Sequence, residues 1–130
     1  MLPLDVASEE SQTGFSEALK ARNIDTVDIL IANAGVSNNN HPVDPALTCT
    51  VDDMAHVYAT NCIGSLLSLQ HHTPRLLASR TKLAVLISSQ MGSITRVQEM
   101  AKGGTLSYRV SKAALNMMAV TYANEPEISK

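Results

Sequence analysis

The chain has 130 residues, 45% of them hydrophobic and 17% charged, and a formal net charge of −2. This composition suits one globular domain, and without a basic run it excludes the usual binders of nucleic acid and anionic membranes. Short apolar stretches, two cysteines in no CxxC pattern and an acidic N-terminus predict a cytoplasmic protein with no membrane partner.

The first half of the chain predicts a strand tail, a helix and a second strand. Residues 2–6 have the composition of a strand end, and Pro3 restricts them to an edge. A helix is expected from Ser8 onward, because apolar side chains then recur on one face. Residues 27–32 form a β-branched run typical of a strand buried on both faces. A loop over residues 33–49 follows.

The second half predicts two helices around another strand. Thr50 and Asp53 have the spacing of a capping box, and they open a long helix that Pro74 is expected to kink or end. The next predicted elements are a strand, a loop and a helix, at residues 82–89, 90–105 and 107–123. Strands alternating with helices at these lengths predict βαβ crossovers, and therefore a parallel sheet covered by helices.

Tyr108 and Lys112 stand four residues apart at the start of the last predicted helix. This separation puts the phenol and the ammonium on one face, a single turn apart. A cation held near a phenol favours the phenolate, which suits an acid/base catalyst. Taken alone, however, the pair is more typical of a half-buried tyrosine beside a lysine with a covered aliphatic stem.

Three further polar positions accompany this pair. Ser89 follows a strand at the end where parallel sheets place ligands, and it could donate a hydrogen bond to a carbonyl oxygen or simply close the strand with a serine turn. Asn61 lies on the apolar stripe of the long helix, where its carboxamide must be hydrogen-bonded, for example to a neighbouring backbone carbonyl. Asn33-Ala34-Gly35 follows the strand at residues 27–32, and its glycine suits a turn or a cofactor lying close to the backbone.

These segments, in this order, resemble the short-chain dehydrogenase/reductase family. The resemblance rests on Asn33-Ala34-Gly35, Asn61-x-x-Gly64, Ser88-Ser89-x-x-Gly92 and Tyr108-x-x-x-Lys112. It implies an α/β fold, namely a partial Rossmann-like fold with a doubly wound parallel sheet. The fold would have three layers (αβα), and it would be truncated at both ends. Residues 1–130 would be the central part of a single NAD(P)-binding domain. The long spacing from Ser89 to Tyr108 resembles that of the sub-group with the C-signal protein and sniffer-like carbonyl reductases.

The resemblance also implies roles for individual residues. In the family, the tyrosine exchanges a proton with the substrate, while the lysine stabilises the phenolate and binds the nicotinamide ribose. The second serine binds the substrate carbonyl, and the asparagine supports a water-linked proton relay. The catalytic residues implied here are Tyr108, Lys112, Ser89 and Asn61. The residues implied to contact NAD or NADP, with no preference between them, are Asp5, Val6, Asn33, Ala34, Gly35, Tyr108 and Lys112.

The function implied is an NAD(P)-dependent oxidoreductase that moves hydride between nicotinamide and a carbonyl or secondary alcohol. A homo-oligomer formed through the two long helices is expected. The alternative is a truncated, non-catalytic chain that acts as an association module, or an incomplete gene product. No metal site is expected, because the adjacent His71 and His72 point about 100° apart on a helix. In the family's strand order, the first two strands lie between the third and the fourth, and those two strands are missing here. Residues 2–4 would therefore be unpaired, and the strand at residues 27–32 would have a bare edge.

Overall fold

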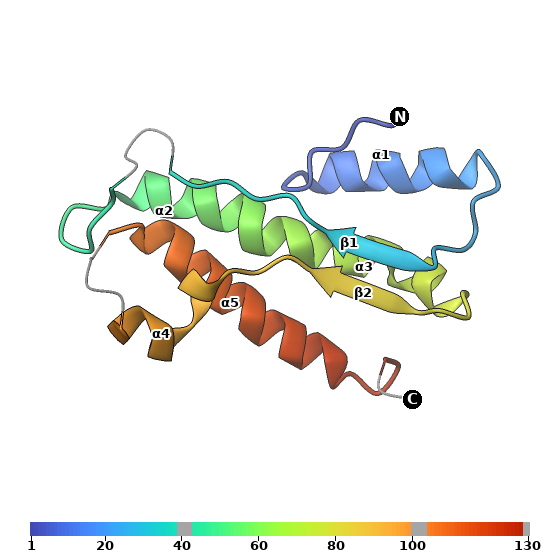
Figure 1. The fold of residues 1–130 in the computed structure, drawn as a ribbon. Helices are drawn as coiled ribbons and strands as arrows, with labels where there is room; N and C mark the ends of the chain where they lie inside the picture. Colours follow the sequence, from blue (N-terminus) through green and yellow to red (C-terminus); the bar gives the residue numbers. More distant parts are fainter. Residues whose placement is uncertain (39–42, 100–103, 129–130) are drawn as a thin grey trace. The chain divides into compact units, whose positions relative to one another are not determined.

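The computed structural model describes residues 1–38, 43–99 and 104–128 (Figure 1). The chain forms two compact units. Unit 1 consists of Met1–Ala34 with Gly64–Ile87, and unit 2 consists of Gly35–Ile63 with Ser88–Lys130. A single domain over residues 1–130 therefore stays a prediction. Within the described residues, no helix is long and apolar enough to cross a membrane.

Unit 1 is a two-stranded parallel sheet with two helices. Strand β1 (Ile29–Ala32) pairs residue for residue with β2 (Leu83–Leu86), and the two strands run parallel. Helix α3 (Gly64–Leu77) packs on both strands, and α1 (Glu9–Lys20) packs on α3. Figure 1 shows the two strands side by side. The parallel pairing that the alternating strand and helix pattern predicts is thus present.

The predicted helix starts are both present, and each has a side-chain cap. Ser8 Oγ accepts a hydrogen bond from the Ser11 N–H at 3.1 Å and so caps α1. In unit 2, Thr50 Oγ1 accepts from the Asp53 N–H at 3.1 Å and donates to the Asp53 carboxylate at 2.8 Å, which caps α2 (Val51–Tyr58). Such caps satisfy backbone donors that have no partner within the helix.

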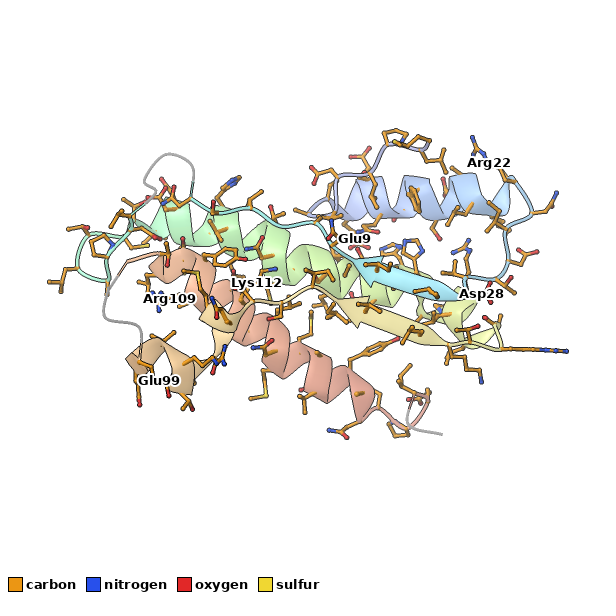
Figure 2. The ribbon with its side chains drawn as sticks, in the orientation of Figure 1. Glu9, Arg22, Asp28, Glu99, Arg109 and Lys112 are labelled. Carbon is orange, nitrogen blue, oxygen red and sulfur yellow. The ribbon has the colours of Figure 1, made fainter. Side chains whose placement is uncertain are left out.

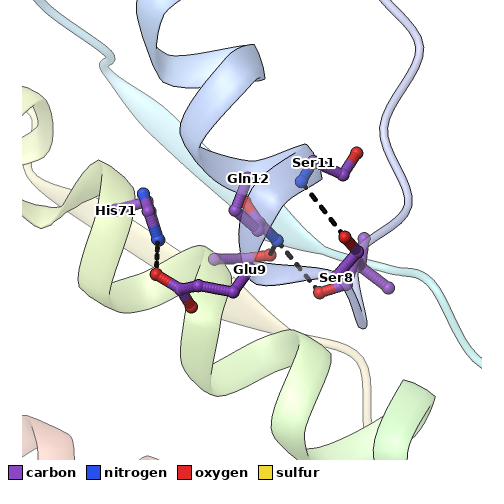
Figure 3. A network of polar contacts seen from close by, with 7 residues as sticks. Ser8, Glu9, Ser11, Gln12 and His71 are labelled. Carbon is purple, nitrogen blue, oxygen red and sulfur yellow. Dashed lines mark hydrogen bonds and ion pairs between the residues drawn. The ribbon is translucent and has the colours of Figure 1, made fainter.

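Polar side chains join α1 to α3 (Figure 3). Gln12 is fully buried, and its Nε2 donates to Ser68 Oγ at 2.9 Å and to the Val6 carbonyl at 3.2 Å. His71 pairs with Glu9 at 2.8 Å. The buried amide therefore fixes how α1 lies on α3, while the more exposed ion pair contributes little to stability.

The predicted long helix has a π-helical turn within it. α2 passes into η1 (Ala59–Ile63), a π turn that contains Asn61, and α3 follows in the sequence. Turns of this kind occur often at functional sites. Pro74 does not end α3, which continues to Leu77. Pro74 removes one N–H hydrogen bond from α3, and the helix ends three residues later.

Two predictions for unit 1 were wrong. Residues 2–6 form no strand: the Asp5 N–H donates to Ser11 Oγ at 2.9 Å rather than to a neighbouring strand. The strand at residues 27–32 is shorter and is not buried on both faces, since Ile29 and Ile31 are 50% and 58% exposed. Exposed and less exposed residues alternate along β1, so Ile29 and Ile31 lie on one face of the strand and that face is the exposed one. Among the described residues, β1 has one strand partner, which leaves the bare edge expected from the sequence.

Unit 2 is helical. α5 (Leu106–Ala123) packs against α2, η1 and η2 (Gln90–Gly92), and α4 (Ile94–Glu99) packs on η2. The predicted loop over residues 90–105 therefore contains two short helices, and residues 100–103 of it lie outside the described part. Val57 and Leu115 form the apolar centre of this unit, with at most 1% of either side chain exposed.

His72 is an unusual core residue of unit 1. It is 4% exposed, its ring meets Phe15 edge-on with centroids 5.5 Å apart, and neither ring nitrogen has a hydrogen-bond partner among the described residues. Burial lowers the pKa of His72 below its ordinary value, and the charges of Arg75 and His71 lower it further. The folded protein therefore holds this ring neutral at pH values where the unfolded chain protonates it.

This burial predicts an acid-dependent loss of stability. As the pH falls below about 6.5, the unfolded His72 takes up a proton and the folded ring does not, so unfolding becomes more favourable until the lower folded-state pKa is reached. We expect His72→Leu to flatten this dependence. Near pH 7, His72→Leu should leave the free energy of unfolding unchanged or raise it by about 1 kcal/mol, because the substitution removes a buried group without hydrogen bonds to the described residues.

Denaturant unfolding at several pH values between about 5 and 8 measures this effect. His71→Gln is the control, since it removes the neighbouring, ion-paired histidine and leaves His72 in place. A pH dependence that is the same in His72→Leu and in the wild type would contradict the assignment.

Candidate active site

Tyr108 and Lys112 lie together on α5. The Lys112 Nζ stands 5.7 Å from the centroid of the Tyr108 ring, which is the distance of a cation–π contact. Lys112 is only 3% exposed, and Figure 2 labels it on α5. Burial lowers the pKa of Lys112 from its ordinary value. The helix thus holds a buried ammonium over a phenol, in the pairing that the four-residue spacing predicts.

Asn61 is fully buried, and its carboxamide bonds to Val36 and to Ser111. Its Oδ1 accepts from the Val36 N–H at 2.7 Å, and its Nδ2 donates to the Val36 carbonyl at 2.9 Å and to Ser111 Oγ at 3.0 Å. The Ser111 hydroxyl in turn donates to the Tyr108 carbonyl at 2.8 Å. Asn61 therefore ties the chain at residue 36 to the turn that carries Tyr108. The bond to a backbone carbonyl, which was the simpler interpretation of Asn61, is part of this arrangement.

Ser89 is half-buried and precedes η2. Its Oγ accepts from the Met91 N–H at 3.2 Å, so the serine turn considered from the sequence is present. A hydroxyl that accepts one hydrogen bond keeps its own proton for donation. The adjacent Ser88 hydroxyl donates to the Asn116 Oδ1 on α5 at 2.6 Å, which holds this segment to the helix of Tyr108.

Gly92 allows η2 to pack directly on α5. A Cβ at this position would lie 2.7 Å from the Lys112 carbonyl carbon and 2.8 Å from its oxygen, closer than real Cβ atoms approach. The Asn116 side chain also donates to the Gly92 carbonyl at 3.3 Å. In the sequence, Gly92 is identified only as the last residue of the Ser-Ser-x-x-Gly segment. The structure adds that it sets the position of Lys112.

Sequence reasoning missed the part that Ser111 plays. Its position three residues after Tyr108 was the available signal, because a helical serine often bonds to a carbonyl one turn earlier. No local pattern indicates that the same hydroxyl accepts from Asn61, fifty residues away. This pair supports the turn of Tyr108.

The residues predicted to contact the cofactor lie in both units. Asp5 is exposed, and its Oδ1 accepts from the Ala7 N–H at 3.0 Å in a local turn. A cavity of about 310 Å³ in unit 1 is lined by residues that include Val6, Asn33 and Ala34. Gly35 lies in unit 2 and does not adopt the positive φ that glycine permits. Among the described residues, no cluster of His, Cys, Asp or Glu could hold a metal ion.

The family model for short chain dehydrogenases matches residues 1–129. The chain belongs to the short-chain dehydrogenase/reductase family. A short-chain dehydrogenase of Neurospora crassa is 32% identical over 124 residues, which cover 95% of this chain and 48% of the relative. The C-signal protein of Myxococcus xanthus is 36% identical over 96 residues, which cover 70% of this chain and 51% of that protein.

Solved structures in the family share the fold. The NADPH-bound carbonyl reductase from chicken fatty liver matches with a TM-score of 0.83 at 33% identity, over 94% of this chain and 50% of that chain. The predicted resemblance and the partial Rossmann-like α/β fold are thereby confirmed. This chain spans about half the length of the relatives it matches.

Proposed function

We propose that the protein containing this chain is an NAD(P)-dependent oxidoreductase acting on a carbonyl or secondary alcohol. The observation that carries the proposal is the buried Lys112 ammonium, 5.7 Å from the centre of the Tyr108 ring on the same helix. Membership of the short-chain dehydrogenase/reductase family supports it, as does the likeness to a carbonyl reductase with bound NADPH.

The chemistry of the donor groups fits a nicotinamide dinucleotide. An ammonium and a phenol on one helix can hydrogen-bond to ribose hydroxyls, and in unit 1 the exposed residues Asn33 and Ala34 line a cavity. When bound, NAD or NADP supplies or accepts the hydride. The residues that would hold it are Asp5, Val6, Asn33, Ala34, Gly35, Tyr108 and Lys112.

The side chains of unit 2 would transfer the proton and stabilise the charge on the substrate oxygen. In reduction, the Tyr108 hydroxyl gives its proton to the carbonyl oxygen, and in oxidation the phenolate takes a proton from the alcohol. The positive charge of Lys112 stabilises the phenolate. The Ser89 hydroxyl donates a hydrogen bond to the substrate oxygen as its charge grows. Asn61 braces the Tyr108 turn through Ser111 and is our candidate for supporting a proton relay.

The proposal is tested by incubating the complete natural polypeptide with NADH or NADPH and a panel of aldehydes and ketones. We expect nicotinamide oxidation that depends on the added carbonyl, together with cofactor binding measured by calorimetry. Failure to bind either dinucleotide would contradict the proposal. Binding to a full-length relative without any cofactor affinity would instead favour the association module.

We also propose a homo-oligomer that uses the long helices. α5 exposes three apolar side chains at helical spacing, with Val110, Met117 and Val120 being 39%, 69% and 60% exposed. We expect Met117→Lys to lower the mass measured by light scattering toward that of a monomer. Leu47→Lys is the control, because Leu47 is 97% exposed but lies outside these helices. An unchanged mass in Met117→Lys would contradict this interface.

The cytoplasm is the compartment we propose. Both Cys49 and Cys62 are free thiols, and this supports the proposal because the cytoplasm keeps thiols reduced.

A further inference from the structure

The helix that carries Tyr108 does not cap its own N-terminus. Thr105 precedes α5 with a left-handed backbone, φ 54° and ψ 38°, and its side chain makes no capping hydrogen bond. Its hydroxyl donates instead to the Gly104 carbonyl at 2.7 Å. Because the first N–H groups of a helix have no partner within it, another part of the chain must satisfy them.

Asp44, more than sixty residues earlier, supplies the missing cap. Its backbone carbonyl accepts from the Leu106 N–H at 3.0 Å. Its carboxylate Oδ2 accepts from the Ser107 N–H at 2.9 Å and from the Ser107 hydroxyl at 2.5 Å. The Cys49 thiol also donates to Oδ2, at 3.6 Å. Asp44 is 2% exposed, so little water competes for these bonds.

The charge of Asp44 suits this place. A carboxylate at a helix N-terminus is stabilised by the helix dipole and by hydrogen bonds from backbone N–H groups. Burial raises the pKa of the Asp44 carboxyl, but the hydrogen bonds from the Ser107 hydroxyl and N–H outweigh it, and the net pKa lies below the ordinary value of 3.8. The Asp44 carboxyl is therefore ionised at neutral pH, and its negative charge is lost only in acid, below the ordinary pKa of 3.8.

Tyr108 follows Ser107 directly, so its turn is held from two sides. Asp44 holds the N–H groups that open the turn, and the Ser111 hydroxyl holds the Tyr108 carbonyl. We propose that Asp44 is a positioning residue for Tyr108: its clamp on Leu106 and Ser107 fixes the turn that presents the phenol. This inference rests on the proposed function, and it adds a residue on which the acid/base step depends.

The test compares Asp44→Ala and Asp44→Asn in the complete natural polypeptide. Thr50→Ala is the matched control, because it removes the side-chain cap of α2, a helix in the same unit that does not carry Tyr108. We expect kcat for carbonyl reduction to fall about tenfold or more in Asp44→Ala, since small displacements of a catalytic group have large effects. Cofactor affinity measured by calorimetry should be unchanged.

The substitution by asparagine distinguishes positioning from folding. Asparagine keeps a side-chain oxygen that can accept from Ser107, so kcat in Asp44→Asn should be higher than in Asp44→Ala. If Asp44→Ala does not fold, Asp44→Asn is compared with the wild type instead. Thr50→Ala should lose some thermal stability, as a helix without its side-chain cap does, while keeping wild-type kcat. A kcat in Asp44→Ala and Asp44→Asn no lower than in Thr50→Ala would overturn the inference.

Hydrogen exchange separates this inference from the proposed function. Asp44→Ala should speed exchange at the Leu106 and Ser107 amides, and Thr50→Ala should not. A wild-type protein without turnover would overturn the proposed function and the catalytic part of the inference together. An active protein whose Leu106 and Ser107 amides exchange equally fast in Asp44→Ala and wild type would overturn the clamp alone.

Discussion

Replacing Tyr108 with phenylalanine is expected to lower kcat by about 10²–10⁴-fold, the usual contribution of a positioned general acid. Phenylalanine keeps the ring that Lys112 covers at 5.7 Å and removes only the hydroxyl. The free energy of unfolding should therefore change little. Cofactor affinity should fall far less than kcat, because the substitution removes one hydrogen-bonding group and leaves Lys112 and the other cofactor-contacting residues in place. Steady-state kinetics with the complete natural polypeptide, combined with calorimetry of cofactor binding, measures both effects.

Tyr122→Phe is the matched control for this substitution. Tyr122 lies on the same helix near its C-terminal end and has no place in the candidate site. It should keep wild-type kcat. If Tyr108→Phe also keeps most of its activity, Tyr108 is not the general acid and the assignment of the site fails.

Replacing Gly92 with alanine is the second change from which we expect a large effect. The added Cβ would lie 2.7 Å and 2.8 Å from the Lys112 carbonyl carbon and oxygen. Because those are backbone atoms of a helix, the clash is relieved only by moving η2 away from α5. Overpacking of this kind costs about 1–3 kcal/mol of stability. We expect kcat to fall as well, about tenfold or more, since Ser89 directly precedes η2 and is displaced with it.

Gly14→Ala provides the comparison for Gly92→Ala. A Cβ at Gly14, in the middle of α1, meets nothing within 4 Å, so this change should stabilise the helix by about 0.5–1 kcal/mol. Denaturant unfolding and steady-state kinetics on both variants measure the difference. Wild-type stability and activity in Gly92→Ala would show that the close packing on Lys112 is not required.

Local patterns predicted the parts of the site that depend on a single helix. Tyr108 and Lys112 meet because the period of the helix sets where residues four apart lie. Ser8 and Thr50 cap their helices because a hydroxyl next to the first turn reaches an N–H group two or three residues on. These contacts depend on short-range geometry, which the sequence contains directly.

The contacts that hold the site in place could not be predicted in the same way. Asp44 and Ser107 are 63 residues apart, and Asn61 and Ser111 are 50 apart, so each bond depends on how segments distant in the sequence pack together. The close approach of Gly92 to Lys112 likewise follows from packing between elements. A serine, an aspartate or a glycine in a loop is compatible with many partners, and nothing in the local sequence selects one.

The two errors in unit 1 have a related cause. Residues 2–6 and the strand at residues 27–32 have strand-like composition, but composition supplies neither the neighbouring strand that a ladder requires nor the packed layer that a buried face requires. Ile29 and Ile31 therefore remain half exposed. In the segment at residues 90–105, helices of three and six residues carry too little periodic signal to be predicted.

The central proposal is tested most directly by following the hydride itself. The complete natural polypeptide is incubated with a nicotinamide dinucleotide carrying deuterium at both positions of its reactive carbon, and the alcohol products of a carbonyl panel are examined by mass spectrometry. We expect deuterium on the carbinol carbon of at least one product with the wild type, and far less with Tyr108→Phe. Cofactor that binds but keeps its deuterium with every carbonyl, or equal transfer by both proteins, would contradict the proposal.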